Sequence, residues 1–92
     1  MIISEAIKRY TDFLYIEKGL SKATIDAYLD DIKLFLDRFK VEETSKIDPL
    51  TVKDFINLQS EQGLASATIV RRLSSVYNFL LFLKDEGFYP KE

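Results

Sequence analysis

The sequence predicts an all-α domain, a four-helix bundle made of two crossed helical hairpins. Four segments place apolar residues at the three- and four-residue spacing of a helix, and glycines or capping residues bound them. No segment alternates apolar and polar residues over a useful length, so no strand is expected. The third observation is an internal repeat, because residues 19–25 return as residues 63–69.

The repeat has a fixed offset of 44 residues. Residues 19–25 read GLSKATI, and residues 63–69 read GLASATI. The match continues at the same offset, with Leu29 aligned to Leu73 and Phe35 aligned to Phe79. Similarity at a fixed offset indicates one supersecondary unit used twice. Each unit reads as a helix, a glycine stop, a capped start and a second amphipathic helix.

The first predicted hairpin pairs a helix over residues 4–18 with a helix over residues 22–40. Gly19 supplies the left-handed residue that ends the first helix, and Ser21 is a good N-cap for the second. The second helix carries an unbroken apolar stripe from Ile25 to Phe39. Residues 41–47 are polar and form the longest loop that we expect.

The second predicted hairpin begins at Asp48-Pro49, an N-cap followed by proline at the first helical position. Its first helix ends near Gln62 and stops at Gly63. Ser66 is expected to cap the fourth helix, which runs to about residue 86. Short connections within each pair of helices favour antiparallel packing.

The second half of the fourth helix has almost no polar side. With Leu73, Val76 and Leu80 facing the core, Phe82 points roughly the other way. We therefore expect Phe82 and Leu81 to be exposed and to form a partner surface.

Composition excludes several classes of function. A chain of 92 residues makes one domain, residues 1–92. It has no cysteine and no histidine, which excludes disulfides, thiolate catalysis and the commonest general base. We expect neither a metal nor a cofactor. No apolar run reaches the ~20 residues that span a bilayer and no signal-peptide pattern opens the chain, which predicts a cytoplasmic protein without a membrane partner.

No catalytic constellation is evident. Asp26 and Asp30 lie one helical turn apart, but they fall on the polar face and are best interpreted as a solvated acidic surface. The hydroxyl side chains near Ser21 and Ser66 have no base beside them in the sequence. The chain by itself is therefore not expected to be an enzyme.

Basic and hydroxyl side chains gather at two helix starts, although the net charge of -2 does not favour a nucleic-acid partner. Helix N-termini present N–H groups and a favourable dipole to phosphate. Lys33 on the second helix and Arg71, Arg72 and Ser75 on the fourth extend the pattern, with Arg71 and Ser75 expected on the outward face. The duplication makes DNA binding competitive with purely structural roles.

Each of these residues also has a structural interpretation. Ser21 and Ser66 are helix caps first. Arg72 is a candidate partner for Asp31 across the bundle, and Lys33 is within reach of neighbouring aspartates on its own helix. Taken singly, only Arg71 favours the functional interpretation.

Three segments of the chain carry a recognisable pattern of residues: Gly19-Leu20-Ser21-x-x-Thr24-x-x-x-Tyr28-x-x-Asp31-Ile32-x-x-Phe35, Ile47-Asp48-Pro49-Leu50-Thr51, and Arg71-Arg72-Leu73-Ser74-Ser75-Val76-Tyr77-x-Phe79-Leu80-x-Phe82-Leu83. In this order and spacing they resemble the core-binding domain of tyrosine recombinases of the phage integrase and Xer group. The resemblance covers essentially the whole chain.

The resemblance implies a SAM-like domain that forms one half of a clamp around duplex DNA. A catalytic domain with the nucleophilic tyrosine forms the other half, and it is expected to be absent here. The implied partners are duplex DNA, that catalytic domain of the same chain, and other recombinase protomers. The N-terminal halves of the second and fourth helices would face the major groove, through Lys22, Ala23, Thr24, Ala27, Ser66, Ala67, Thr68, Arg71 and Ser75.

Two other classes of protein remain as alternatives. A protein-interaction module of SAM or death-domain type also uses a small acidic helical bundle, and an exposed Phe82 would favour it. The duplicated helix starts disfavour that alternative. A helix-turn-helix regulator is less favoured, because no pair of short helices is joined by a tight three-residue turn.

Overall fold

The computed structural model describes residues 1–88, with the side chain of Pro49 excepted. Helix α1 spans Ile3–Asp12 and continues into a π-helical turn, Phe13–Glu17. Helix α2 spans Lys22–Arg38, a short 3₁₀ turn spans Thr44–Lys46, and helices α3 and α4 span Pro49–Glu61 and Ser66–Asp85. The described part of the chain has no strand, only an isolated bridge between Ile2 and Glu43. The all-α prediction is confirmed.

Most of the capping residues and glycines predicted to begin or end helices do so in the structure. The Ser21 hydroxyl accepts a hydrogen bond from the Thr24 backbone N–H at 3.3 Å and so caps α2. The Asp48 carboxylate accepts one from the Leu50 N–H at 2.8 Å and caps α3. Gly19, with a φ of 63°, takes the left-handed conformation before α2, which non-glycine residues rarely adopt.

The expected cap of α4 is wrong. Ser66 is already the first helical residue, and the N-cap is Ala65, whose side chain makes no capping hydrogen bond. The repeat itself indicates the reason, since Ala65 is the residue 44 positions after the true cap Ser21. The two copies are thus in register, but the second lacks a capping side chain.

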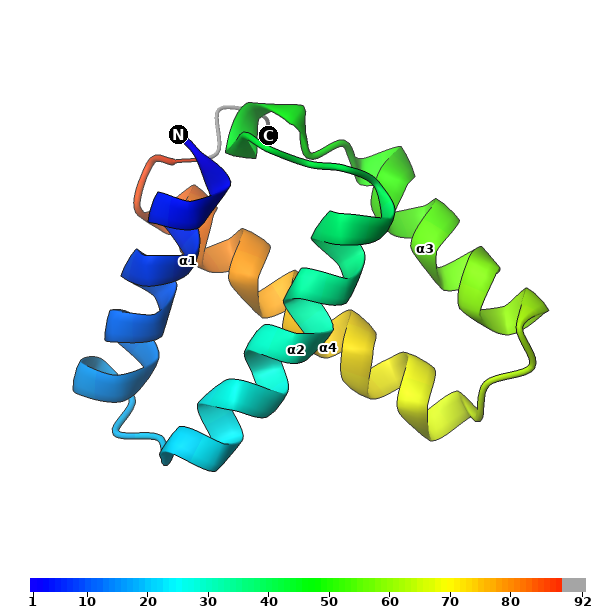
Figure 1. Ribbon diagram of the computed structural model, residues 1–92, viewed down its shortest axis with the longest axis horizontal. Coiled ribbons are helices and arrows are strands. Elements are labelled where there is room, and N and C mark those ends of the chain that lie inside the picture. The colour runs from blue at the N-terminus through cyan, green and yellow to red at the C-terminus, as the bar shows by residue number, and fades with distance from the viewer. Residues whose placement is uncertain (89–92) are drawn as a thin grey trace.

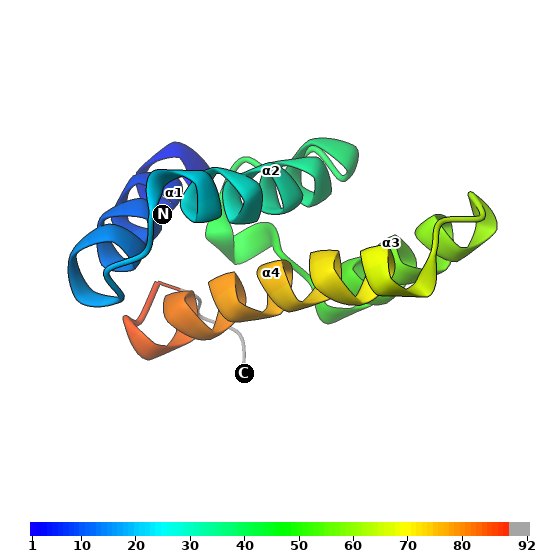
Figure 2. The same cartoon turned by 90° about the horizontal axis from the view of Figure 1, so that it is seen from below.

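The two hairpins form two layers, with α1 and α2 in one and α3 and α4 in the other (Figures 1 and 2). Helix α2 crosses α4 near the centre of the molecule, and α1 and α3 lie on opposite sides of that crossing (Figure 1). The crossed arrangement of hairpins is as predicted. An approximate two-fold axis, close to vertical in Figure 1, relates the first hairpin to the second.

Repeat-equivalent residues make the core of this crossing. Phe35 and its equivalent Phe79 are both fully buried. The outer helices then pack on opposite helices: the ring of Tyr10 on α1 lies 5.2 Å from that of Phe79, and the ring of Phe55 on α3 lies 5.3 Å from that of Phe35. Ile32 is likewise buried with its equivalent Val76. The repeat seen in the sequence is therefore a symmetry of the packing.

The exposure predicted for Phe82 is wrong. Phe82 is 7% exposed, and its ring lies 5.1 Å from that of Tyr10 and 4.9 Å from that of Phe13. The buried stripe of α4 is centred on Phe79, whereas the prediction centred it on Leu80. Phe82 is three residues after Phe79 and so lies on the same face of the helix.

The connection between the hairpins is more ordered than a polar loop. Thr44 is fully buried, and its hydroxyl donates to the Phe88 carbonyl at 2.6 Å. The Thr44 backbone N–H donates to the Met1 carbonyl at 2.9 Å, and Ile47 is buried in the core. Residues near both ends of the described chain therefore hold this connection.

Within residues 1–88, no helix is long and apolar enough to cross a membrane. The same residues contain no cluster of acidic side chains arranged to hold a metal ion.

Candidate nucleic-acid interface

The starts of α2 and α4 lie on the same side of the molecule. Both helices begin along the lower edge of Figure 1 and converge upward toward their crossing. Figure 2, seen from below, looks onto this side. The free N–H groups of both helix starts therefore point to one face, to which the helix dipoles lend positive potential.

The start of α2 carries balanced charge. Lys22 is highly exposed, and its ammonium lies 2.8 Å from the Asp26 carboxylate. The hydrogen bond from Lys22 to Asp26 and their attraction raise the pKa of the Lys22 ammonium. Ala23 and Ala27 are exposed and small, and Thr24 is partly covered because it bonds to Ser21. Small side chains at the start of α2 would let another molecule approach the helix closely, but the Lys22 ammonium is already paired with Asp26.

The start of α4 contains no acidic residue of its own. Ser66 and Ala67 are exposed and Thr68 is half-buried. Residues 63–84 hold three basic residues and no acidic one, whereas the equivalent residues 19–40 hold four of each. The second copy therefore carries local positive charge within a net acidic chain.

A buried carboxylate lies where α2 and α4 cross. The side chain of Asp31 is only 5% exposed. One carboxylate oxygen accepts a hydrogen bond from an Arg71 terminal nitrogen at 2.9 Å, and the other accepts one from the Ser75 hydroxyl at 2.9 Å. Ser75 is the repeat equivalent of Asp31, so the two residues meet at the approximate two-fold axis.

This cluster corrects the predicted position of one residue and confirms the predicted pairing of another. Ser75 was expected on the outward face, but its side chain is buried against Asp31. Arg72 pairs with Asp31 as expected, with its Nε 3.9 Å from the carboxylate, and its terminal nitrogen donates to Gln59 at 3.1 Å. Arg71 makes the close contact with Asp31. Gln59, buried on α3, has no signal in the sequence that marks it.

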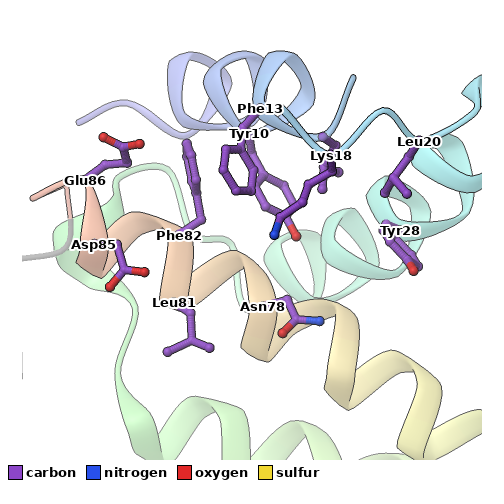
Figure 3. A pocket seen from close by; sticks show the side chains of 11 residues that line it. Tyr10, Phe13, Lys18, Leu20, Tyr28, Asn78, Leu81, Phe82, Asp85 and Glu86 are labelled. Carbon is purple, nitrogen blue, oxygen red and sulfur yellow. The ribbon is translucent and has the colours of Figure 1, made fainter. Parts of the chain in front are cut away.

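The remaining predicted cations and the partner surface also have defined positions. Lys33 is exposed, and within residues 1–88 no ion pair joins it to Asp30 or Asp37. In Figure 3, Phe82 is directed toward Tyr10 and Phe13, while Leu81 points away from both rings. Leu81 is exposed as predicted. Phe82 is buried instead, and together with Tyr10 and Phe13 it lines a groove.

Comparison with known proteins identifies the family. The model of the phage integrase N-terminal SAM-like domain matches residues 7–87. The chain is 33% identical over 82 residues to the tyrosine recombinase XerC of Thermodesulfovibrio yellowstonii, an alignment that covers 89% of this chain and 27% of that protein. It is 34% identical over 79 residues to the tyrosine recombinase XerD of Chlamydia trachomatis, covering 86% of this chain and 26% of that protein.

A third relative extends the match along the chain. The tyrosine recombinase XerD of Staphylococcus haemolyticus is 33% identical over 89 residues, which covers 94% of this chain and 30% of that protein. No solved structure gives a significant match. The chain thus spans between a quarter and a third of the length of these curated relatives. It belongs to the family of phage integrase N-terminal SAM-like domains.

Proposed function

We propose that this chain is the DNA-binding domain of a site-specific tyrosine recombinase. It would grip duplex DNA through the N-terminal halves of α2 and α4. The observation that carries the proposal is the pair of helix starts on one face, in a domain whose relatives are named tyrosine recombinases. Strand cleavage would then belong to the part of the parent protein that this chain does not cover, because the chain has no histidine or cysteine.

In this proposal α4 supplies most of the affinity. Arg71 projects from the start of α4, and 59% of its side chain is exposed. Ser66, Ala67 and Thr68 precede it and offer two hydroxyls and a small surface, while the Thr68 backbone N–H donates to the Ala65 carbonyl at 3.0 Å. On α2, the small side chains of Ala23 and Ala27 would allow DNA to approach the helix closely, and Lys22 and Lys33 would supply positive charge. The phosphate contacts would position the domain, and sequence would be read by the few side chains that reach base edges.

Salt dependence tests the proposal. We expect weak binding to duplex DNA that neutralises roughly three to five phosphates, so log K should fall with log salt at a slope of about -3 to -5. The measurement is fluorescence anisotropy of a labelled random-sequence duplex titrated with the chain at several salt concentrations. A folded sample that binds no duplex at low salt would contradict the proposal.

An apolar stripe on α4 favours a second candidate function, protein interaction. Val70 is 60% exposed and Tyr77 is 58% exposed, and with Leu81 they lie at helical spacing on the outer face of α4. The double variant Val70→Ser with Tyr77→Ser separates the two candidates. Loss of self-association or partner binding with unchanged DNA affinity would assign this stripe to a protein partner, whereas loss of DNA affinity would place it on the DNA face.

A further inference from the structure

We infer that Asp31 is a positioning residue for DNA binding, because it holds the guanidinium of Arg71 in place at the face where α2 and α4 begin. The inference rests on the proposed function and adds a residue whose charge is opposite to that expected of a DNA contact. Asp31 would not touch DNA, since its side chain is buried. It acts on DNA only through Arg71.

The geometry shows a tether that leaves the arginine free to bind. Arg71 gives one terminal nitrogen to Asp31 at 2.9 Å. A guanidinium has five N–H donors in a planar fork, so most of them remain available to a phosphate or a base edge. With 59% of its side chain exposed, Arg71 is accessible from solvent.

The carboxylate is itself held in place. Its second oxygen accepts a hydrogen bond from the Ser75 hydroxyl at 2.9 Å, and the same hydroxyl lies 3.2 Å from the Arg71 backbone carbonyl, so its one proton is shared between the two acceptors. The Arg72 guanidinium lies behind the same carboxylate and is fixed by Gln59. Contacts from α4 and, through Gln59, from α3 thus support a buried anchor on α2, and the exposed arginine is attached to that anchor.

Two opposing effects on DNA affinity can be compared. Ordering a long side chain upon binding weakens affinity by about three- to tenfold, and a tether that orders it beforehand removes most of that loss. The negative charge of Asp31 acts in the other direction, because it repels phosphate, but salt screens charges over about 8–10 Å. We expect the ordering of Arg71 to exceed the repulsion.

The substitution Asp31→Asn tests this balance, with Asp30→Asn as its matched control. Both changes remove one negative charge from α2, at adjacent positions, but Asp30 is exposed and is not among the partners of Arg71. If only charge mattered, each variant would bind DNA at least as tightly as the parent chain does, and the two variants would have similar affinities. Our inference predicts that Asp31→Asn binds about three- to tenfold more weakly than Asp30→Asn.

A second pair of variants separates positioning from a general structural role. In an Arg71→Ala background, Asp31→Asn should produce no further loss of affinity, because the side chain it positions is gone. Affinities are measured by anisotropy with the labelled random-sequence duplex at about 0.1 M ionic strength, where charges are screened over about 10 Å. They are measured well below the melting temperature of each variant, and circular dichroism verifies that each is folded.

The outcomes are distinct. If the parent chain and Asp30→Asn both fail to bind the duplex, the proposed function is overturned and this inference with it. If they bind and Asp31→Asn binds as tightly as Asp30→Asn, only the positioning role is overturned. An equal loss with and without Arg71 also overturns it, since Asp31 would then act through the crossing of the helices.

One further variant keeps the inference testable if Asp31→Asn does not fold. Arg71→Lys retains the positive charge, but a single ammonium lacks the planar fork that can serve a carboxylate and a phosphate together. We expect Arg71→Lys to lose affinity by a factor similar to that of Asp31→Asn. Parental affinity in Arg71→Lys would overturn the inference.

Discussion

The two copies of the repeat have the same backbone plan but differ in their helix caps and in their balance of charged residues. In the first copy, Ser21 caps α2, and acidic residues match the basic ones along the helix. In the second copy, α4 begins without a side-chain cap, and its three basic residues face no acidic residue of their own segment. The first copy thus has features that stabilise a helix, and residues 63–84 of the second carry local positive charge without acidic residues.

The difference is sharpest where the copies meet. Asp31 and Ser75 are equivalent positions, yet one is a carboxylate and the other a hydroxyl. Two aspartates at this axis would repel each other in a buried site, and two serines would leave the Arg71 guanidinium without an anion. With one aspartate and one serine, the buried carboxylate has a hydrogen-bond donor in Ser75 and the Arg71 guanidinium has an anion in Asp31. The difference between the two copies at this position therefore suits the crossing of α2 and α4.

The largest effect should come from the residues that both copies share. Phe35→Ala and Phe79→Ala each empty a fully buried aromatic site, and each should lower the free energy of unfolding by about 3–5 kcal/mol. Urea denaturation of the two variants measures both losses. A difference of more than about 2 kcal/mol between them would show that the hairpins do not share the core evenly.

High pH should act on only one of the two outer-helix contacts. Tyr10 fixes α1 to α4, whereas the corresponding contact of α3 uses Phe55, which does not ionise. Burial, aided by the nearby Tyr28, raises the pKa of Tyr10 to about 12. The unfolded tyrosine ionises near pH 10, so this contribution is intact below pH 10 and is lost as the pH rises to about 12, an effect of about 3 kcal/mol.

Unfolding measured between pH 9 and pH 12 tests this expectation. The variant Tyr10→Phe should lose the part of the alkaline destabilisation that belongs to Tyr10, while Tyr77→Phe, which changes an exposed ring, should behave as the parent chain does. If Tyr10→Phe and the parent chain lose stability in parallel, the Tyr10 ring is not the titrating group.

The next largest loss of stability is expected from the contact of Asp31 with Ser75 and Arg71 at the approximate two-fold axis. Asp31→Ala removes the acceptor of two hydrogen bonds and leaves the Arg72 guanidinium without its nearby anion, so it should cost about 2 kcal/mol of unfolding free energy. The loss stays moderate because the exposed Arg71 can return to water. Ser75→Ala should cost about 1 kcal/mol, as one hydrogen bond is lost while the carboxylate keeps Arg71.

Thermal unfolding of the two variants provides the comparison. A larger loss in Ser75→Ala than in Asp31→Ala would reverse the roles assigned to the two equivalent positions. It would show that the hydroxyl, and not the carboxylate, holds the crossing together.

The fold could be predicted from the sequence because its signals are local and repeated. Helix spacing, Gly19, Gly63 and the caps Ser21 and Asp48 all act within a few residues, so their effects appear in the sequence itself. The 44-residue offset added the pairing of the hairpins. These signals were enough for the all-α class, the four helices and the crossing.

The candidate site was predicted less well, because its details depend on how α4 is rotated. A shift of the buried stripe by one residue, from Leu80 to Phe79, places Phe82 and Ser75 inside and attaches Arg71 to Asp31. Apolar residues cover so much of the second half of α4 that its pattern alone does not define the rotation. Thr44 and Gln59 are similar cases, since long-range contacts alone determine their burial.

The smallest expected effect separates the two helix starts themselves. Ser21→Ala removes the hydroxyl that accepts the Thr24 N–H, so α2 should lose about 1 kcal/mol of stability. Ser66→Ala removes a hydroxyl that caps nothing, so the free energy of unfolding should change by less than about 0.5 kcal/mol. Ser66→Ala should instead weaken DNA binding slightly if the hydroxyl meets a phosphate, whereas in Ser21→Ala the loss of stability should be the larger effect. Equal losses of stability in the two variants would mean that Ser66 caps α4 after all, and the contrast between a capped first copy and an uncapped second copy would then not hold at this position.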